Sequence, residues 1–91
     1  MYKVSDTVRS THSQDGAVVL DIHQGEMFNL NPVGSRILEL LKTGSTKSEV
    51  VDQISRQFSV DRTEVDRDIH EFIAILQEHR LIVDTTANDR K

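Results

Sequence analysis

The sequence predicts an α+β domain in which a three-stranded antiparallel sheet packs on a three-helix winged helix-turn-helix. Three observations lead to this fold class. Residues 2–31 contain short segments in which apolar and polar side chains alternate, as they do in half-buried strands. Residues 32–80 carry apolar side chains at helical spacing, with breaks at Thr43-Gly44 and at 59–60. The last two helical segments follow each other closely, as in a helix-turn-helix.

The chain has the size of one domain, because 91 residues support a single modest core. We assign residues 1–83 to this domain and predict that residues 84–91, DTTANDRK, form a disordered polar tail. The absence of cysteine excludes disulfides and thiolate metal sites. No apolar run resembles a signal peptide or a membrane span, so we expect a soluble, cytoplasmic protein with no membrane partner.

Three strands are expected before the first helix. The first spans residues 2–8, where apolar side chains alternate incompletely because Asp6 interrupts them. Residues 10–16, STHSQDG, have the composition of a turn. Residues 17–23 form a clearer strand. Its faces carry Val18, Leu20 and Ile22 on one side and Ala17, Val19 and Asp21 on the other.

A tight turn is expected to return the chain, because Gly25 is free to adopt positive φ. Residues 26–31 then run antiparallel to the preceding strand. Alternation divides this strand between the two faces of the sheet, with Phe28 and Leu30 toward the core and Met27 and Asn29 away from it.

Helix-capping signals set the first two helices. Asn31-Pro32 starts the first helix, because asparagine accepts from free N–H groups and proline fits the first helical position. Thr43-Gly44 ends it. Thr46 and Glu49 form a Thr-x-x-Glu capping box that opens the second helix.

The third helix is expected over residues 61–80, with Asp61 as its cap. Residues 81–83, LIV, form a short closing strand. Helical spacing predicts that one stripe of the third helix lies in the core, namely Val65, Ile69, Phe72 and Leu76.

The charge pattern argues against nucleic acid as a partner. The formal net charge is -4, whereas a DNA-binding surface needs lysines and arginines for the phosphates. The third helix has six acidic residues and three arginines, which leaves it negative by three. We interpret most of these charges as a solvated helix face with pairs such as Arg67–Glu71. DNA binding remains an alternative only because the predicted fold has the outline of a winged helix-turn-helix.

No residue pattern predicts catalysis or a bound cofactor. The sequence contains no His-Glu-x-x-His, Gly-x-Ser-x-Gly or phosphate-loop motif. His70 and His79 are nine residues apart on one helix, about 13 Å, so they do not share a metal ion. We therefore expect no enzyme activity, no cofactor and no metal site.

The edge of the sheet is the candidate interaction surface. Residues 26–31 present unpaired N–H and C=O groups with which an extended peptide or a second copy of the chain can pair. This strand has no lysine, and its first proline follows its end. Peptide capture by strand addition and a homodimer through the sheet edge are therefore both open.

Two stretches, VVLDIHQGEMFNLNPVGSRILELLKTG and TKSEVVDQISRQFSVDRTEVDRDIHEFIAILQEHRLI, resemble the PqqD-like family over about residues 15–83. The shared features occur in a fixed order. They are a strand ending in Leu-Asp, a glycine turn, a bulky residue before Leu-Asn, Ile-x-Glu-Leu-Leu and a Thr-x-x-Glu second helix. One departure is Arg80, where the family often has glycine, and this puts the local turn in doubt.

The resemblance implies a recognition element for ribosomally synthesised and post-translationally modified peptides. A precursor's leader would add as a strand beside residues 26–30, with apolar side chains in the groove next to the third helix. The protein would present the precursor to a leader peptidase or another modifying enzyme. LNPVGSRILELL looks closest to the stand-alone recognition proteins of lasso-peptide clusters. The alternative is a precursor chaperone in pyrroloquinoline quinone biosynthesis.

The same resemblance places peptide contacts on the third strand and on one flank of the third helix. Through their backbone, the strand contacts are Glu26, Met27, Phe28, Asn29 and Leu30. The helix contacts are Asp68, Glu71, Phe72, Ile75 and His79. Met27 and Ile75 are expected to contact apolar side chains of the leader, and the two carboxylates to meet its basic or N–H groups. The alternatives are an exposed Met27, a core role for Phe28, Leu30 and Ile75, and a solvated face for the carboxylates.

Overall fold

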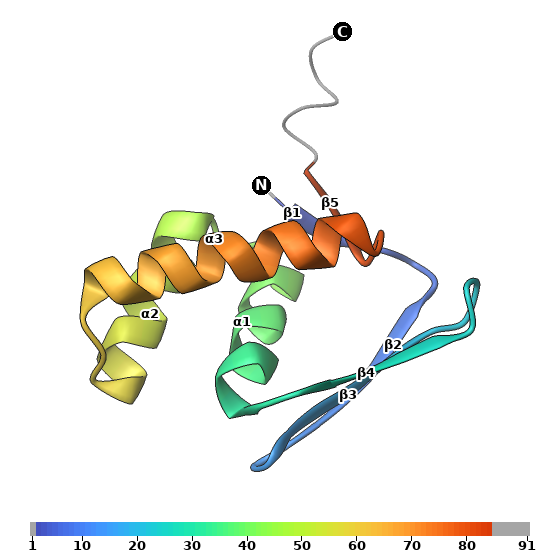
Figure 1. The fold of residues 1–91 in the computed structure, drawn as a ribbon, viewed down its shortest axis with the longest axis horizontal. Helices are drawn as coiled ribbons and strands as arrows, with labels where there is room; N and C mark the ends of the chain where they lie inside the picture. Colours follow the sequence, from blue (N-terminus) through green and yellow to red (C-terminus); the bar gives the residue numbers. More distant parts are fainter. Residues whose placement is uncertain (1, 85–91) are drawn as a thin grey trace, which may run out of the picture.

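The computed structural model describes residues 2–84 as three helices with a three-stranded and a two-stranded sheet (Figure 1). The strands are β1 (Tyr2–Val4), β2 (Val8–Ser13), β3 (Gly16–Asp21), β4 (Glu26–Leu30) and β5 (Ile82–Asp84). The helices are α1 (Pro32–Lys42), α2 (Lys47–Phe58) and α3 (Arg62–Glu78). The predicted α+β class is confirmed. Residue 84 of the predicted tail ends β5, and the rest of that tail lies outside the described residues.

The larger sheet has the order β2-β3-β4, with both pairs antiparallel. The return of the chain through β4 is confirmed, but the prediction for the first strand is wrong. Residues 2–8 do not form one strand, and most of the predicted turn at 10–16 belongs to β2. The inward positions Ser10 and His12 are polar and bond to α1, so apolar alternation did not reveal this strand.

The small sheet joins the two ends of the described chain. β1 pairs antiparallel with β5, and Tyr2 lies opposite Asp84. The predicted closing strand is thus confirmed, one residue later than expected, but it pairs outside the main sheet. β1 packs on α1 and β5 packs on α3. The pair therefore closes the fold around the core.

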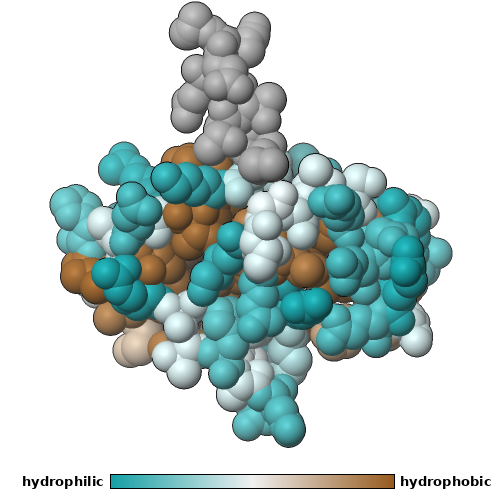
Figure 2. Space-filling model, turned by 180° about the vertical axis from the view of Figure 1, so that it is seen from behind, coloured by the Kyte–Doolittle hydropathy of each residue, from teal (hydrophilic) through white to brown (hydrophobic). Residues whose placement is uncertain are grey.

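The two faces of β3 have different surroundings. Ala17, Val19 and Asp21 face inward and are buried, while Val18, Leu20 and Ile22 are exposed on the outer face. Asp21 is only 1% exposed, because its carboxylate binds the β3–β4 turn. Figure 2 shows that apolar surface gathers at the end of the molecule that holds the sheet, while the α2 end is mostly hydrophilic.

All three helices begin at the predicted cap residues, and in two of them the cap side chain makes a hydrogen bond to the first turn. The Asn31 side chain accepts a hydrogen bond from Gly34 N at 2.7 Å, and Thr46 and Glu49 form the predicted capping box. Asp61 occupies the predicted N-cap position of α3, but its side chain makes no capping hydrogen bond. Acidic Glu64 in the first turn still favours this helix start.

The C-terminal end of α3 has arginine at position 80, where the family resemblance led us to expect glycine. Arg80 has φ +62°, the left-handed conformation that glycine adopts more easily. Arg80 N donates to Gln77 O, and Leu81 N donates to Leu76 O, which is the Schellman pattern. The turn therefore forms despite arginine, and it directs the chain into β5.

The core lies among the three helices and β3, where α1 packs on β3 and α2, and α2 packs on α3. Val19 is its contribution from the larger sheet. The stripe predicted for α3 is buried at Val65, Ile69 and Leu76, whereas Phe72 is only half-buried at the margin. This partial burial leaves one side of Phe72 free for the adjoining groove.

Candidate functional site

A groove of about 510 Å³ lies between β4 and α3, with α1 beneath it. The β4 wall and the α1 floor follow each other directly in the sequence, whereas the α3 wall comes from a segment about 30 residues further along the chain. The side chains and backbone that line it belong to Asn29, Leu30, Asn31, Val33, Gly34, Ile37, Asp68, Glu71, Phe72 and Ile75. The floor and the α3 wall combine aliphatic and aromatic side chains, so the groove suits apolar groups of a ligand.

The α3 wall of the groove consists mainly of two apolar residues, the half-buried Phe72 and the exposed Ile75. Ile75 is 51% exposed, although it is a large aliphatic side chain. Phe72 leans over α1, and a Cβ at Gly34 would lie 3.4 Å from the Phe72 ring. The absence of a side chain at Gly34 thus lets the α3 wall approach α1. An apolar ligand group in this groove would cover Ile75 and the free side of Phe72.

The β4 wall ends in an unpaired edge. β4 pairs with β3 on one side, and within residues 2–84 no strand pairs with its other side. A strand edge of this kind exposes N–H and C=O groups that an extended chain satisfies. The groove therefore borders a backbone surface with strand-pairing capacity along its whole β4 side.

Two carboxylates stand on the rim of the groove. Asp68 and Glu71 line it, and both are exposed. The expected Arg67–Glu71 pair does not form; the ion pair at this region of α3 joins Asp66 to Lys47 of α2 at 4.0 Å. Among residues 2–84, neither Asp68 nor Glu71 has a hydrogen bond or ion pair. The rim is consequently an acidic surface available to a cationic group.

His79 closes the groove at the hairpin end. Its ring meets Phe28 edge-on with centroids 5.0 Å apart, and its Nδ1 lies 3.8 Å from Glu26 Oε1. Gln24 Nε2 donates to the His79 carbonyl at 2.9 Å. The C-terminal cap of α3 is therefore joined to the β3–β4 hairpin.

Asp21 anchors that hairpin from inside. Its carboxylate accepts from Gln24 Nε2 at 2.6 Å, from Thr7 Oγ1 at 3.2 Å and from the backbone N–H groups of His23 and Gln24 at 3.0 and 3.2 Å. These donors, the Gln24 side chain foremost, hold the pKa of Asp21 below its usual range, although burial acts in the opposite direction. The turn is thus fixed by an ionised side chain.

The structure brings most of the predicted contact residues to this groove. Asn29, Leu30, Asp68, Glu71, Phe72 and Ile75 line it, and Glu26, Phe28 and His79 gather at its hairpin end. Met27 lies elsewhere, because its side chain is 67% exposed and opposite Leu20 on the outer face. The sequence did not identify Val33 and Ile37 as groove residues, since only the packing of α1 beneath α3 brings them there.

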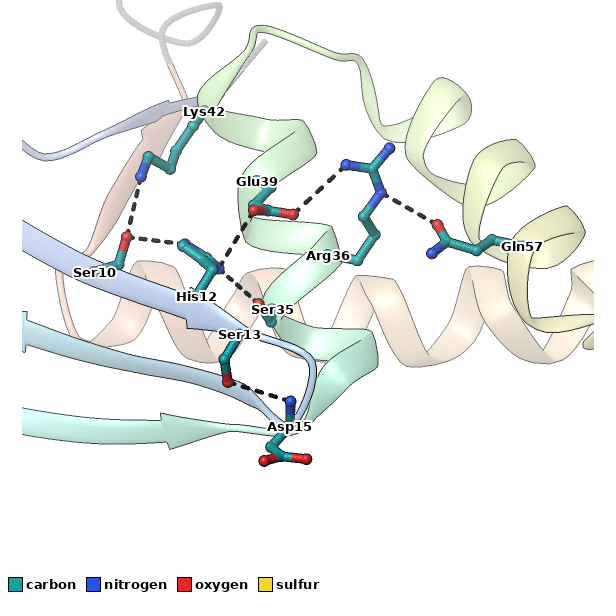
Figure 3. Close-up of polar contacts among 9 residues, drawn as sticks. All are labelled: Ser10, His12, Ser13, Asp15, Ser35, Arg36, Glu39, Lys42 and Gln57. Atoms are coloured by element: carbon teal, nitrogen blue, oxygen red, sulfur yellow. Dashed lines mark hydrogen bonds and ion pairs between the residues drawn. The ribbon is translucent and has the colours of Figure 1, made fainter.

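A second polar cluster joins β2 to α1 (Figure 3). His12 Nδ1 lies 2.6 Å from Ser35 Oγ and 3.8 Å from Glu39 Oε2, and His12 Nε2 lies 3.0 Å from Ser10 Oγ. A serine–histidine–carboxylate relay needs the hydroxyl and the carboxylate on opposite ring nitrogens. Here Ser10 and Glu39 lie on opposite ring nitrogens, but the 3.8 Å between Glu39 Oε2 and Nδ1 is too long for a hydrogen bond, and Ser35 Oγ already occupies Nδ1. The geometry is that of a structural network.

Within residues 2–84, no three histidine, aspartate or glutamate side chains gather closely enough to hold a metal ion. In the same part of the chain, no helix has the length and apolar character needed to cross a bilayer.

Comparisons with known proteins place this fold in a family. TbiB1 in complex with the TbiA(beta) leader peptide is 42% identical, with a TM-score of 0.82 over 88% of this chain and 93% of that one. A lasso peptide synthetase B1 complexed with its leader peptide is 24% identical, with a TM-score of 0.81 over 91% and 98%, and it supports the fold alone. No curated protein matches. Residues 16–82 match the family described as coenzyme PQQ synthesis protein D, PqqD, and the chain therefore belongs to the PqqD family.

Proposed function

We propose that this protein binds the leader segment of a ribosomally synthesised precursor peptide, of the lasso-peptide type, and presents it to a partner enzyme. The observation that carries the proposal is the pairing-competent edge of β4 beside an apolar groove. The likeness to TbiB1, which forms a complex with a leader peptide, supports the same ligand class.

The leader adds as a strand along β4 in this proposal. Main-chain hydrogen bonds supply affinity, and alternate side chains point into the groove against Phe72 and Ile75. Backbone pairing uses Glu26 to Leu30 whatever their side chains, so Met27 takes part although its side chain lies on the outer face. Ordering a disordered leader opposes binding, which sets the expected dissociation constant between about micromolar and nanomolar.

Presentation to the enzyme follows from tethering and needs no chemistry by this protein. A captured leader keeps the rest of the precursor at a high effective concentration for a peptidase or another modifying enzyme bound to the same assembly. The serine–histidine cluster lacks relay geometry, so the recognition role assigns no catalytic residue to residues 2–84. We place this role in the cytoplasm, where ribosomes release the precursor.

The quinone pathway is the alternative within the family. The family description itself names coenzyme PQQ synthesis, which favours a precursor chaperone for that pathway. The 42% identity with TbiB1 over most of both chains favours the lasso-peptide assignment instead. Both alternatives use the same groove, and they differ in which precursor binds.

Titration of the isotope-labelled protein tests the proposal. The probe is the TbiA(beta) leader peptide, with which the 42% identical TbiB1 forms a complex, and the readout is the set of backbone amide shifts. We expect saturable shifts confined to residues 26–31 and 68–79. Shifts with duplex DNA but none with the leader would reject peptide capture. A doubled mass without leader, together with shifts at residues 26–30 that depend on protein concentration, would show that a second copy occupies the β4 edge.

A further inference from the structure

The two walls of the groove are joined by polar contacts at one end only. At the hairpin end, His79 receives the Gln24 amide on its carbonyl and approaches Glu26 through its ring. Within residues 2–84, no other hydrogen bond or ion pair connects α3 or its cap to β2, β3 or β4. The separation of the walls at this end therefore depends on a small number of contacts in the β3–β4 turn.

Gln24 is the central residue of this connection. One nitrogen, Nε2, donates both to Asp21 Oδ2 at 2.6 Å and to the His79 carbonyl at 2.9 Å. A side-chain amide has two N–H hydrogens, so it serves both acceptors at once. Asp21 is buried and held by its other donors, which gives Gln24 a fixed anchor inside the hairpin.

The His79 carbonyl is among the last carbonyls of α3, which have no partner within the helix and accept from side chains or water. Gln24 satisfies this one from a residue 55 positions away in the sequence. The hydrogen bond therefore caps α3 and connects it to the sheet at the same atom.

We propose that Gln24 is a positioning residue for leader binding, which sets the distance between β4 and the C-terminal end of α3. The inference rests on the proposed function. A bound leader must pair with the β4 backbone at the strand spacing of about 4.8 Å while its side chains reach Phe72 and Ile75 on α3. Both requirements hold only at one separation of the walls, so a loosened α3 end weakens binding without any lost contact to the leader.

The test compares two glutamine-to-glutamate substitutions in turns of the same sheet. Gln24→Glu keeps the size of the side chain but removes the donor and places a carboxylate beside Asp21. Gln14→Glu makes the same change in the β2–β3 turn, where the exposed side chain has no hydrogen bond among residues 2–84. We expect about tenfold weaker leader binding for Gln24→Glu, chiefly through faster dissociation, and wild-type affinity for Gln14→Glu.

A third variant separates donation from simple disturbance of the turn. Gln24→Lys restores donor hydrogens through its ammonium group, and we expect it to recover most of the lost affinity. Amide hydrogen exchange of the free protein supplies a readout that needs no leader. Exchange at residues 77–81 should accelerate in Gln24→Glu relative to α2 of the same variant, and stay at the wild-type rate in Gln14→Glu.

The outcomes distinguish this inference from the proposed function. Equal leader affinities of the Gln24→Glu and Gln14→Glu variants would overturn the positioning role while leaving peptide capture intact. Equal losses in Gln24→Glu and Gln24→Lys would also overturn it, because donation would then be irrelevant. A wild-type protein that binds no leader would overturn the proposed function, and altered exchange in Gln24→Glu would then report a purely structural contact.

Discussion

The two edge strands of the larger sheet, β2 and β4, each pair with β3 and have no second strand partner within residues 2–84, yet their surroundings differ. Beside β2, inward polar side chains already bond to α1, through His12 to Ser35 and through Ser10 to Lys42. The hollow there is about 280 Å³ and is lined mainly by polar and charged residues, whereas that beside β4 is about 510 Å³ and has Phe72 and Ile75 in one wall. A free edge alone therefore does not distinguish a peptide site; an open apolar wall next to it does.

The largest loss of leader affinity is expected from a substitution in the apolar wall beside β4. Ile75→Asp places a charge where a leader side chain should be buried, and we expect at least about a hundredfold loss of leader affinity. The residue is half exposed in the free protein, so the fold should survive. Calorimetric titration measures the loss. Val60→Asp alters another exposed aliphatic residue away from the groove and should bind normally. Unchanged affinity in folded Ile75→Asp would remove α3 from the site.

A second substitution tests the β2 side of the comparison. Ser35→Ala removes the hydroxyl that meets His12 and leaves a partly buried ring nitrogen without its partner. We expect the free energy of unfolding to fall by about 1–2 kcal/mol with leader affinity unchanged. Urea denaturation measures the first quantity. Ser48→Ala on the exposed face of α2 is the control. A loss of affinity in Ser35→Ala would mean that both edges contribute to binding.

Lowering the pH tests how much the ionised Asp21 in the β3–β4 hairpin contributes to stability. The folded-state pKa of Asp21 is lowered by its donors, so its contribution to stability is present above the unfolded pKa and is lost as pH falls through the folded one. We therefore expect stability to decline below about pH 4, and to decline less steeply in Asp21→Asn. Denaturation midpoints between neutral and acidic pH measure the slope. Identical slopes would show that Asp21 is not the group responsible.

The smallest expected effect concerns the rim of the groove. If a basic leader side chain meets Glu71, Glu71→Gln should weaken binding about threefold, with the difference shrinking at high salt. Glu64→Gln on the first turn of the same helix lies outside the groove and serves as the control. Equal affinities of the two variants would favour the solvated-face interpretation of these carboxylates.

Local chemistry made much of this fold predictable. Asn31-Pro32 and the Thr46–Glu49 capping box carry their signals within a few residues, and both helices begin where expected. The groove beside Phe72 and Ile75 was predicted from the resemblance to the PqqD-like family, while helical periodicity indicated that Ile75 lies on the flank next to the core stripe. Such features need no knowledge of the tertiary structure.

The features that the sequence did not reveal depend on partners far away in the chain. β2 was assigned partly to a turn because Ser10 and His12 look like loop residues until α1 supplies their partners. Asp21 occupies the buried face of β3 for the same reason, since its donors come from the turn and from Thr7. Val33 and Ile37 belong to the groove only through the packing of α1 beneath α3.

The pairing of β1 with β5 has a consequence for modular use of this domain. Tyr2 lies opposite Asp84, so the two ends of the described chain leave the fold as antiparallel neighbours, about 5 Å apart between Cα atoms. Neither strand lines the groove. Residues 2–84 should therefore tolerate insertion into a surface loop of another protein, such as a modifying enzyme, with short connections and an unobstructed binding edge.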